Sequence, residues 1–445
     1  MSTSISKKDI VVLFLGWTLT LFSVVMLYKQ GIERSYFHQD DVVELGVVAD
    51  WQGWSTLGVM NNEHLNVTFW PLLRLQWMLF GISYTPYLMM NIILHVIVLT
   101  LIFLITYRQT KSLLWSSVPV WAMVINANWF TVVWWITGQM IFLTTIFALI
   151  SYLVILMIKD DKKNLLLLPL LYIFSVLPGM SWGVGLTWPV WPMLIFGIDY
   201  QNRRINAIGK SLLLAQITLV FVYFSLVGKG LSVHTDPRTW LSNPLAILNF
   251  AYVGIRNTLI GRWLWPLEDL SIRAMILIST LITFLFFKPF KWINQNVWFG
   301  FLVVFGSFVT FAIPRWQFGI DHAMANYYAY FPLPFLLISV SVLMSRMSLV
   351  GIKKCLVIFV VLVHIPLSWI GFEWWARVWV MRPQQTRDYF AHLDRLQPDE
   401  CITNEYLPMY IVPQNIWRID YIWPIFKKDF NPFCSEDYRI QTDKQ

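Results

Sequence analysis

Residues 112–158 read SLLWSSVPVWAMVINANWFTVVWWITGQMIFLTTIFALISYLVILMI and contain no Asp, Glu, Lys, Arg or His. The core of a bilayer holds no water, so a segment that crosses it must satisfy its own backbone hydrogen bonds. A charge-free apolar stretch of this length therefore predicts membrane-spanning helices, at about 20 residues each. It has room for two such helices, with the expected break near Asn126–Trp135.

The whole composition points in the same direction. Of 445 residues, 57% are hydrophobic and only 13% are charged, whereas a soluble domain carries about 25% charge. This deficit excludes a soluble globular enzyme, a disordered chain and a collagen-like fibre. The sequence holds 25 Trp and 18 Tyr, which suit two aromatic belts at the membrane surfaces. The predicted fold class is an all-α polytopic membrane protein.

Further uncharged stretches predict the other spans, and together they make about eleven transmembrane helices. Asn164–Ile198 is expected to form two short helices, broken around Pro178–Gly185. The first span follows Lys7 and Lys8 without a small-residue cleavage site, so we interpret it as a retained helix. The remaining predicted spans are Ile10–Tyr28, Thr85–Tyr107, Ser211–Gly228, Ala274–Phe287, Val297–Ile313, Ala325–Ser345 and Cys355–Gly371.

Lysine and arginine gather in alternate short loops, which predicts the orientation. With the N-terminus in the cytoplasm, every short cytoplasmic loop is basic. The net charge of +8 is therefore explained by topology, and a nucleic-acid partner is not expected. The outer face receives loops at about 29–84, 229–273 and 314–324. We expect a membrane domain at 1–371 and an external C-terminal cap at 372–445.

Two of the three cysteines, Cys401 and Cys434, lie in this external cap, where a disulfide between them is favoured. Two buried free thiols are the alternative, because sequence cannot show their geometry. The third, Cys355, lies in the last predicted span. The cysteines show no metal-ligand spacing.

The first outer loop opens with YFHQDDVVE, residues 36–44. Close like charges raise one another's pKa, so Asp40 and Asp41 suit a general base that deprotonates a hydroxyl. They also suit a metal ligand set together with His38 or Glu44. A solvated acidic loop start is the alternative.

Two more groups of polar residues on the outer face are candidates for substrate binding. Glu63 and His64 are of the types that contact sugars or phosphates, or they form a capped turn before an amphipathic helix at Val67–Phe80. Arg315 is the lone basic residue of a short outer loop, and its guanidinium suits a lipid phosphate. The same stretch carries Asp321, His322 and Tyr327. Anchoring to lipid headgroups is the alternative for Arg315.

Polar residues within the predicted spans, such as His95 and Asn91, are expected to bond between helices. His364 in the last span is interpreted in the same way. The sequence has no nucleotide-binding loop, and its clear helices carry no charge in mid-span. Both observations argue against a pump or an ion-coupled transporter.

The order of these parts resembles the GT-C class of integral membrane glycosyltransferases. Asn62–His64, Phe80–Gly81 and Tyr87–His95 are similar to bacterial members. Arg315–Tyr328 resembles a Gly-acidic-polar-Ala run that ends in an Arg-Tyr pair, although Asn326 stands at the Arg position. Length and pattern look most like the serotype-converting O-antigen glucosyltransferases, and the class resemblance extends to about residue 371.

The resemblance implies an enzyme of the bacterial inner membrane, with its C-terminus in the periplasm. Its donor would be a sugar, glucose by the resemblance, on undecaprenyl phosphate, and its acceptor a hydroxyl of lipid-linked O-antigen. Asp40 would act as base in an inverting transfer, and Asp41 would orient the acceptor or share the proton. No cofactor is required, and a divalent metal stays open. A small flippase and a lipid-sugar synthase are the implied partners.

Two other classes of function remain open from the sequence. A flippase or transporter for a lipid-linked glycan would move its substrate without forming a glycosidic bond. A polymerase-like protein would change the length of the glycan chain instead of adding a side branch.

Overall fold

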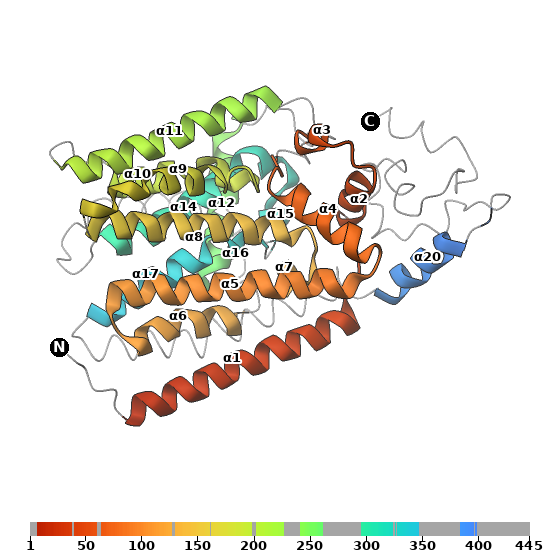
Figure 1. Cartoon of the computed structure of the whole chain (residues 1–445), viewed down its shortest axis with the longest axis horizontal. Helices are drawn as coiled ribbons and strands as arrows, with labels where there is room; N and C mark the ends of the chain where they lie inside the picture. The colour runs from red at the N-terminus through yellow and green to blue at the C-terminus, as the bar shows by residue number, and fades with distance from the viewer. Residues whose placement is uncertain are drawn as a thin grey trace.

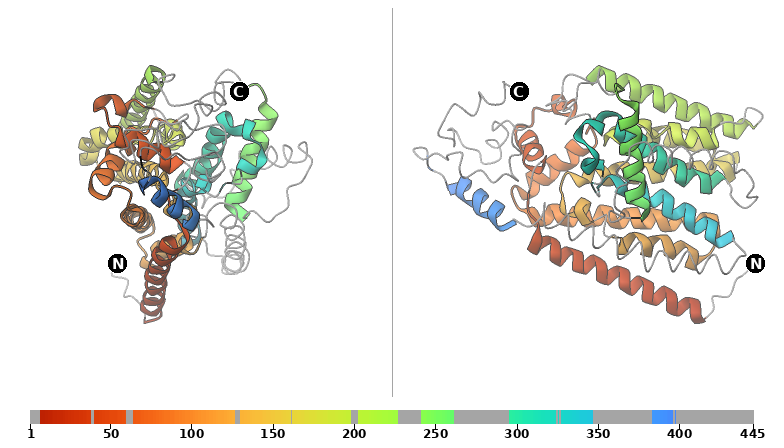
Figure 2. Two further views of the ribbon diagram at one scale, coloured as in Figure 1. Left: turned by 90° about the vertical axis from the view of Figure 1, so that its right-hand side faces the viewer. Right: turned by 180° about the vertical axis from the view of Figure 1, so that it is seen from behind.

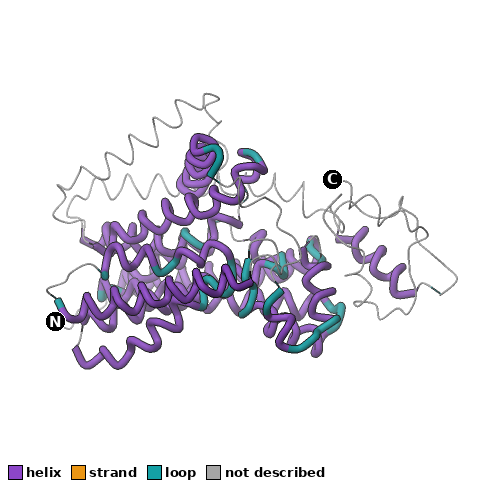
Figure 3. Tube along the Cα trace, turned by 90° about the horizontal axis from the view of Figure 1, so that it is seen from above, coloured by secondary structure: helices purple, strands orange, loops and turns teal. Residues whose placement is uncertain are grey.

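The computed structural model is helical throughout the part of the chain that it describes, and no strand occurs there (Figure 3). The described residues are 7–37, 40–59, 64–126, 130–160, 162–197, 202–226, 241–260, 295–323, 325, 327–346, 383–395 and 397. This confirms the all-α prediction for these ranges.

The first half of the chain forms α1 (Lys7–Arg34), α2 (Asp40–Ala49), α3 (Trp54–Leu57), α4 (Phe69–Phe80), α5 (Tyr84–Thr110), α6 (Leu113–Ile125), α7 (Phe130–Trp134), α8 (Gly138–Asp160), η2 (Lys162–Leu167), α9 (Leu168–Val176), η3 (Gly183–Thr187), α10 (Val190–Phe196) and α11 (Arg203–Leu226). The second half forms α12 (Pro244–Ile260), α14 (Gln295–Arg315), η5 (Trp316–Phe318), α15 (Ile320–Ala323), α16 (Tyr327–Tyr330), α17 (Leu333–Arg346) and α20 (Pro383–Arg395). Most of the long helices run along a shared axis (Figure 1).

Four helices of the described part are long and apolar enough to cross a membrane. They are Tyr84–Thr110, Gly138–Asp160, Arg203–Leu226 and Gln295–Phe318, and shorter apolar helices accompany them. Large apolar side chains also face outward on α1 and α11, where Phe14 is 70% exposed and Phe221 is 73% exposed. Apolar surface of this kind is stable against lipid, as expected of a membrane protein. The predicted spans at 274–287 and 355–371 lie outside the described residues.

Both predicted breaks occur where the sequence indicates them. α6 ends at Ile125, and α8 begins only at Gly138, with the short α7 between them. α9 ends at Val176, and the chain turns through Pro178 before η3. A side chain at Gly185 would lie 2.2 Å from the carbonyl group of Pro178, so only glycine permits this close approach.

One end of the helical bundle is basic, and its contacts join the ends of four helices. Arg108 of α5 pairs with Asp160 of α8 at 2.7 Å. Arg204 of α11 donates to the carbonyl oxygen of Lys159 at 2.9 Å, and Lys159 reaches Gln295 of α14 at 3.0 Å. This end lies near the N-terminus in Figure 1, while α2, α3, α4 and α20 lie at the opposite end.

The predicted outer loops contain helices of their own. The amphipathic helix expected at 67–80 is α4. It exposes Leu75, Met78 and Leu79 and buries Phe69, Trp70, Leu73 and Gln76. Within 229–273 the described residues form α12, which packs against α14 and runs across the long helices (Figure 2).

A reciprocal pair of amides fastens α4 to the start of α8. The Gln76 amide donates to Gln139 Oε1 at 2.7 Å, and the Gln139 amide donates to Gln76 Oε1 at 3.0 Å. Both side chains are almost fully buried. A buried polar group is costly unless it is bonded, so each amide depends on the other.

Replacing Gln76 by Leu removes one half of this pair and leaves the Gln139 amide buried without its partner. We expect a loss of about 1–3 kcal/mol in unfolding free energy, measured by thermal unfolding in detergent. The double variant Gln76→Leu/Gln139→Leu should recover much of this loss. The exposed Gln52→Leu is the control. Equal melting of the single and double variants, both below the native protein, would contradict the reciprocal dependence.

Candidate functional site

A small cavity lies at the end of the bundle opposite the basic contacts. Its polar lining comes from Asp40, His64, Thr137, Arg315, Tyr327 and Tyr328, and its apolar lining from Trp135, Met140, Ile141 and Trp182. The cavity measures about 40 Å³. Five segments of the chain therefore converge on one small cavity with a polar lining.

Asp40 reaches this cavity from the first turn of α2. The helix is buried along most of its length, with Val42, Leu45 and Val48 at most 2% exposed. Acidic residues are stabilised at a helix N-terminus, where the backbone dipole is positive. Asp40 is half-buried and Asp41 fully buried, so the alternative of a solvated acidic loop start is wrong.

Asp41 and Glu44 lie on another side of α2 and bind Thr137. Asp41 Oδ1 accepts from the Thr137 backbone N–H at 2.9 Å and lies 3.0 Å from its hydroxyl. That hydroxyl lies 2.6 Å from Glu44 Oε2. Thr137 precedes α8, so these carboxylates also face the positive end of that helix. Asp40 lines the cavity, whereas neither of these two carboxylates is among its described lining residues.

The break before α8 is held by side chains of α5. The Asn91 amide donates to the carbonyl oxygens of Val133 and Trp135, both at 2.8 Å. The Tyr84 hydroxyl donates to Trp134 at 2.6 Å. Asn91 thus makes the contact between helices that the sequence predicts. His95 does the same one turn further on, with Nδ1 2.7 Å from the Tyr330 hydroxyl.

His64 lies between a backbone donor and a cation. Its Nδ1 accepts from the Gly183 N–H at 3.2 Å, while its Nε2 lies 3.3 Å from the guanidinium of Arg315. A neutral imidazole has only one acceptor nitrogen. When Gly183 uses Nδ1, the proton is on Nε2, and this N–H lies next to the N–H groups of Arg315. Such an arrangement suits an anionic oxygen.

Arg315 ends α14 and is only 9% exposed. Its guanidinium carbon lies 5.5 Å from the centre of the Phe318 ring. A cation is favoured at this end of a helix. On the next turn of chain, His322 Nε2 lies 2.8 Å from the Tyr328 hydroxyl. His322 therefore contacts Tyr328, a residue of the cavity wall, and is not itself among the lining residues.

Tyr327 lies close enough to both Asp40 and Arg315 for their charges to affect it. It lies in the short α16, in the loop that follows α14. Burial raises the pKa of Tyr327 well above its ordinary value, and the neighbouring Tyr328 and Asp40 raise it further, whereas Arg315 acts in the opposite direction. Its hydroxyl is therefore neutral and serves as a hydrogen-bond donor or acceptor.

Trp135, Thr137 and Trp182 are among the lining residues that the sequence analysis missed. Trp182 is 3% exposed and stacks on Tyr328 with ring centres 6.3 Å apart. Trp135 packs on Tyr327 at 5.4 Å. Each of these three residues lies in one of the two breaks within the charge-free stretches, and this position is the sequence signal that could have identified them.

Other predicted residues are not brought to the cavity by the described contacts. Glu63, Cys401 and Cys434 lie outside the described residues, as do Cys355, His38 and His364. Asp321 belongs to α15, and its side chain is not described. Among the described side chains, no group of three His, Cys, Asp or Glu could hold a metal ion.

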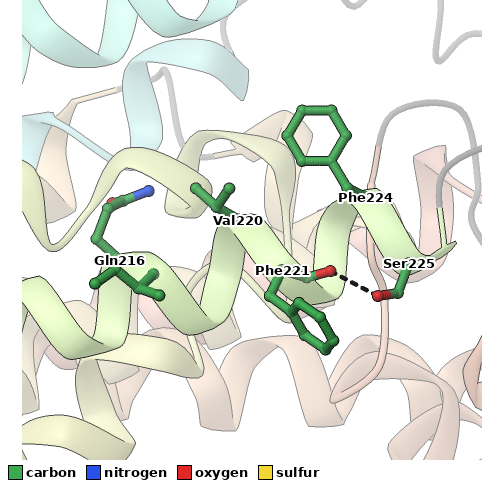
Figure 4. Close-up of a pocket in the computed structure, with 6 residues that line it drawn as sticks. Gln216, Val220, Phe221, Phe224 and Ser225 are labelled. Carbon is green, nitrogen blue, oxygen red and sulfur yellow. Dashed lines mark hydrogen bonds between the residues drawn. The ribbon is translucent and has the colours of Figure 1, made fainter.

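A second hollow, of about 500 Å³, lies along α11 (Figure 4). Its lining is Gln216, Ile217, Val220, Phe221, Phe224 and Ser225. The Ser225 hydroxyl donates to the Phe221 carbonyl oxygen of its own helix at 2.8 Å. This lining offers no titratable group, and we assign no chemistry to it.

Comparison with known proteins finds no family model, no curated protein and no solved structure that matches this chain.

Replacing Thr137 by Val keeps the shape of the side chain and removes its hydroxyl. Asp41 and Glu44 then stay buried without that hydrogen bond, so we expect a loss of about 1.5–3 kcal/mol in unfolding free energy. Thermal unfolding in detergent measures it. Thr137→Ser should retain most of the stability. Thr100→Val, at an exposed hydroxyl bonded only within its own helix, is the control. An unchanged melting temperature for Thr137→Val would refute this role.

Proposed function

We propose that this protein transfers a sugar, with glucose as the expected one, from undecaprenyl phosphate to a hydroxyl of lipid-linked O-antigen. The resemblance to GT-C enzymes supplies the substrate class. One observation of the structure supports it: Asp40 shares a small enclosed cavity with His64 and Arg315. A carboxylate therefore lies beside two groups that favour anions, as an acid–base transfer from a phosphate ester requires.

In this proposal Asp40 takes the proton of the acceptor hydroxyl. The acceptor oxygen attacks the anomeric carbon from the side opposite the phosphate, and the bond from that carbon to the phosphate oxygen breaks. The configuration at the anomeric carbon is thereby inverted. The released lipid phosphate keeps the bonding electrons, and its charge is stabilised by the guanidinium of Arg315 and by the Nε2–H of His64. The phosphate is already a good leaving group, so no metal is required.

The enclosure of the cavity favours transfer over hydrolysis. Trp135 and Trp182 supply apolar walls to a small space. A site that excludes water strengthens the interaction of charged groups with the reacting atoms and protects an activated sugar.

The place of the cavity fits a periplasmic reaction. It lies at the end of the bundle opposite Arg108, Lys159 and Arg204. Basic loop residues favour the cytoplasmic side, so we assign the cavity to the periplasmic side of the inner membrane. There a lipid phosphate headgroup lies at the same depth as the ends of the helices.

The variant Asp40→Asn keeps the size of the side chain and removes the base. We expect transfer to fall by about 10²–10⁴-fold, measured with purified protein in vesicles that contain undecaprenyl-phosphate glucose and lipid-linked O-antigen. Asp50→Asn, just beyond the other end of α2 and exposed, is the control.

Native-level transfer by correctly inserted Asp40→Asn would remove Asp40 from the mechanism. The native protein itself also tests the proposal in this assay. Movement of the lipid across the vesicle without a new glycosidic bond would make it a flippase. A change in glycan length would make it polymerase-like.

Arg315→Lys keeps one positive charge and loses the planar fork that binds two phosphate oxygens. We expect a raised KM for the lipid donor and a fall in transfer of about 10–10³-fold, with acceptor KM unchanged. Arg108→Lys, at the opposite end of the bundle, should behave like the native protein. A donor KM that does not change in Arg315→Lys or Arg315→Ala would count against the phosphate role.

A further inference from the structure

The C-terminal helix α20 contacts the junction between α1 and α2, which leads directly to Asp40. Figure 1 shows α20 beyond the end of the bundle that carries α2. Its polar side chains Asp388, His392 and Arg395 are exposed, whereas Phe390 is only 2% exposed. The helix therefore has one face to solvent and one face to the junction.

Arg387 binds the end of α1 in two ways. Its guanidinium donates to the carbonyl oxygens of Ile32 and Ser35, the latter at 3.3 Å. The last carbonyls of a helix have no partner within that helix and carry partial negative charge. The guanidinium carbon also lies 5.5 Å from the centre of the Tyr36 ring, at the distance of a cation–π contact.

Phe390 fixes the next two residues of the junction. Its ring lies 5.6 Å from Tyr36, edge to face, and 5.9 Å from Phe37, stacked. Phe37 is itself fully buried and meets Tyr84 at 5.4 Å. Burial raises the pKa of Tyr36 and Arg387 opposes that effect, which is consistent with their proximity.

The other side of Asp40 is anchored separately. Asp41 and Glu44 hold α2 to Thr137, and Arg74 of α4 donates to the carbonyl oxygen of Val48. The chain on the N-terminal side of Asp40 is held by the Ser35 hydroxyl, which donates to Trp134 at 3.2 Å, and by α20. Removal of the α20 contacts leaves the anchors on α2 intact.

We propose that Arg387 and Phe390 are positioning residues, through which the C-terminal segment holds the α1–α2 junction and sets the place of Asp40 in the cavity. Helix α20 then helps to position the site. The activity arm of the test rests on the proposed function, while the structural arm stands without it.

The structural arm compares hydrogen–deuterium exchange in Arg387→Ala, Phe390→Ala and the double variant. We expect exchange at residues 33–41 to rise by about tenfold or more, because local opening governs exchange. Exchange in α5 and α8 should stay native. Arg395→Ala and His392→Ala, on the exposed face of the same helix, are the controls. Native exchange at the junction in the double variant would overturn the proposal.

The activity arm uses the same variants in the vesicle assay. A displaced Asp40 lowers kcat, whereas the donor contacts of Arg315 and His64 remain, so we expect kcat to fall by about tenfold with donor KM unchanged. Arg387→Lys, which can still reach the carbonyl oxygens, should recover part of the loss. Native kcat together with raised exchange would overturn the link to Asp40. If the native protein transfers no sugar, the exchange result still decides whether α20 holds the junction.

Discussion

The site depends on which groups form hydrogen bonds to the backbone where a helix ends inside the bundle. Between α7 and α8 the helical hydrogen-bond pattern is interrupted, and the carbonyls of Val133 and Trp134 and the N–H of Thr137 take side-chain partners. In a membrane such groups must be bonded by protein or line a cavity. Here Asn91, Tyr84 and Asp41 bind them, and each comes from an element outside the break.

The same contacts hold α2 in place as well as the break between α7 and α8. Because Asp41 and Glu44 are used to hold Thr137, α2 cannot rotate without losing two buried contacts. Asp40 then keeps its direction toward the cavity. The second break, at Pro178–Gly185, acts in a similar way, since the N–H of Gly183 orients the imidazole of His64. Two interruptions in apolar helices thus orient the Asp40 carboxylate and the His64 imidazole.

Much of the helical framework could be predicted from charge-free stretches, and both breaks fall where polar residues, Pro and Gly interrupt them. The difference between Asp40 and Asp41 could not be predicted. Neighbouring residues on a helix point about 100° apart, but the sequence indicated a loop there. Thr137, the Gln76–Gln139 pair and the contacts of α20 were also missed, because they join residues tens to hundreds of positions apart and leave no periodic signal.

The small size of the cavity has a consequence for turnover. The described lining leaves a space of about 40 Å³ beside Asp40, and the proposed reaction brings a sugar and its acceptor to that space. Trp135 and Tyr327, which pack on each other in the cavity wall, are the aromatic side chains whose movement would widen this space. In the proposed reaction, such a movement on each turnover would be a step that can limit the rate in addition to bond formation.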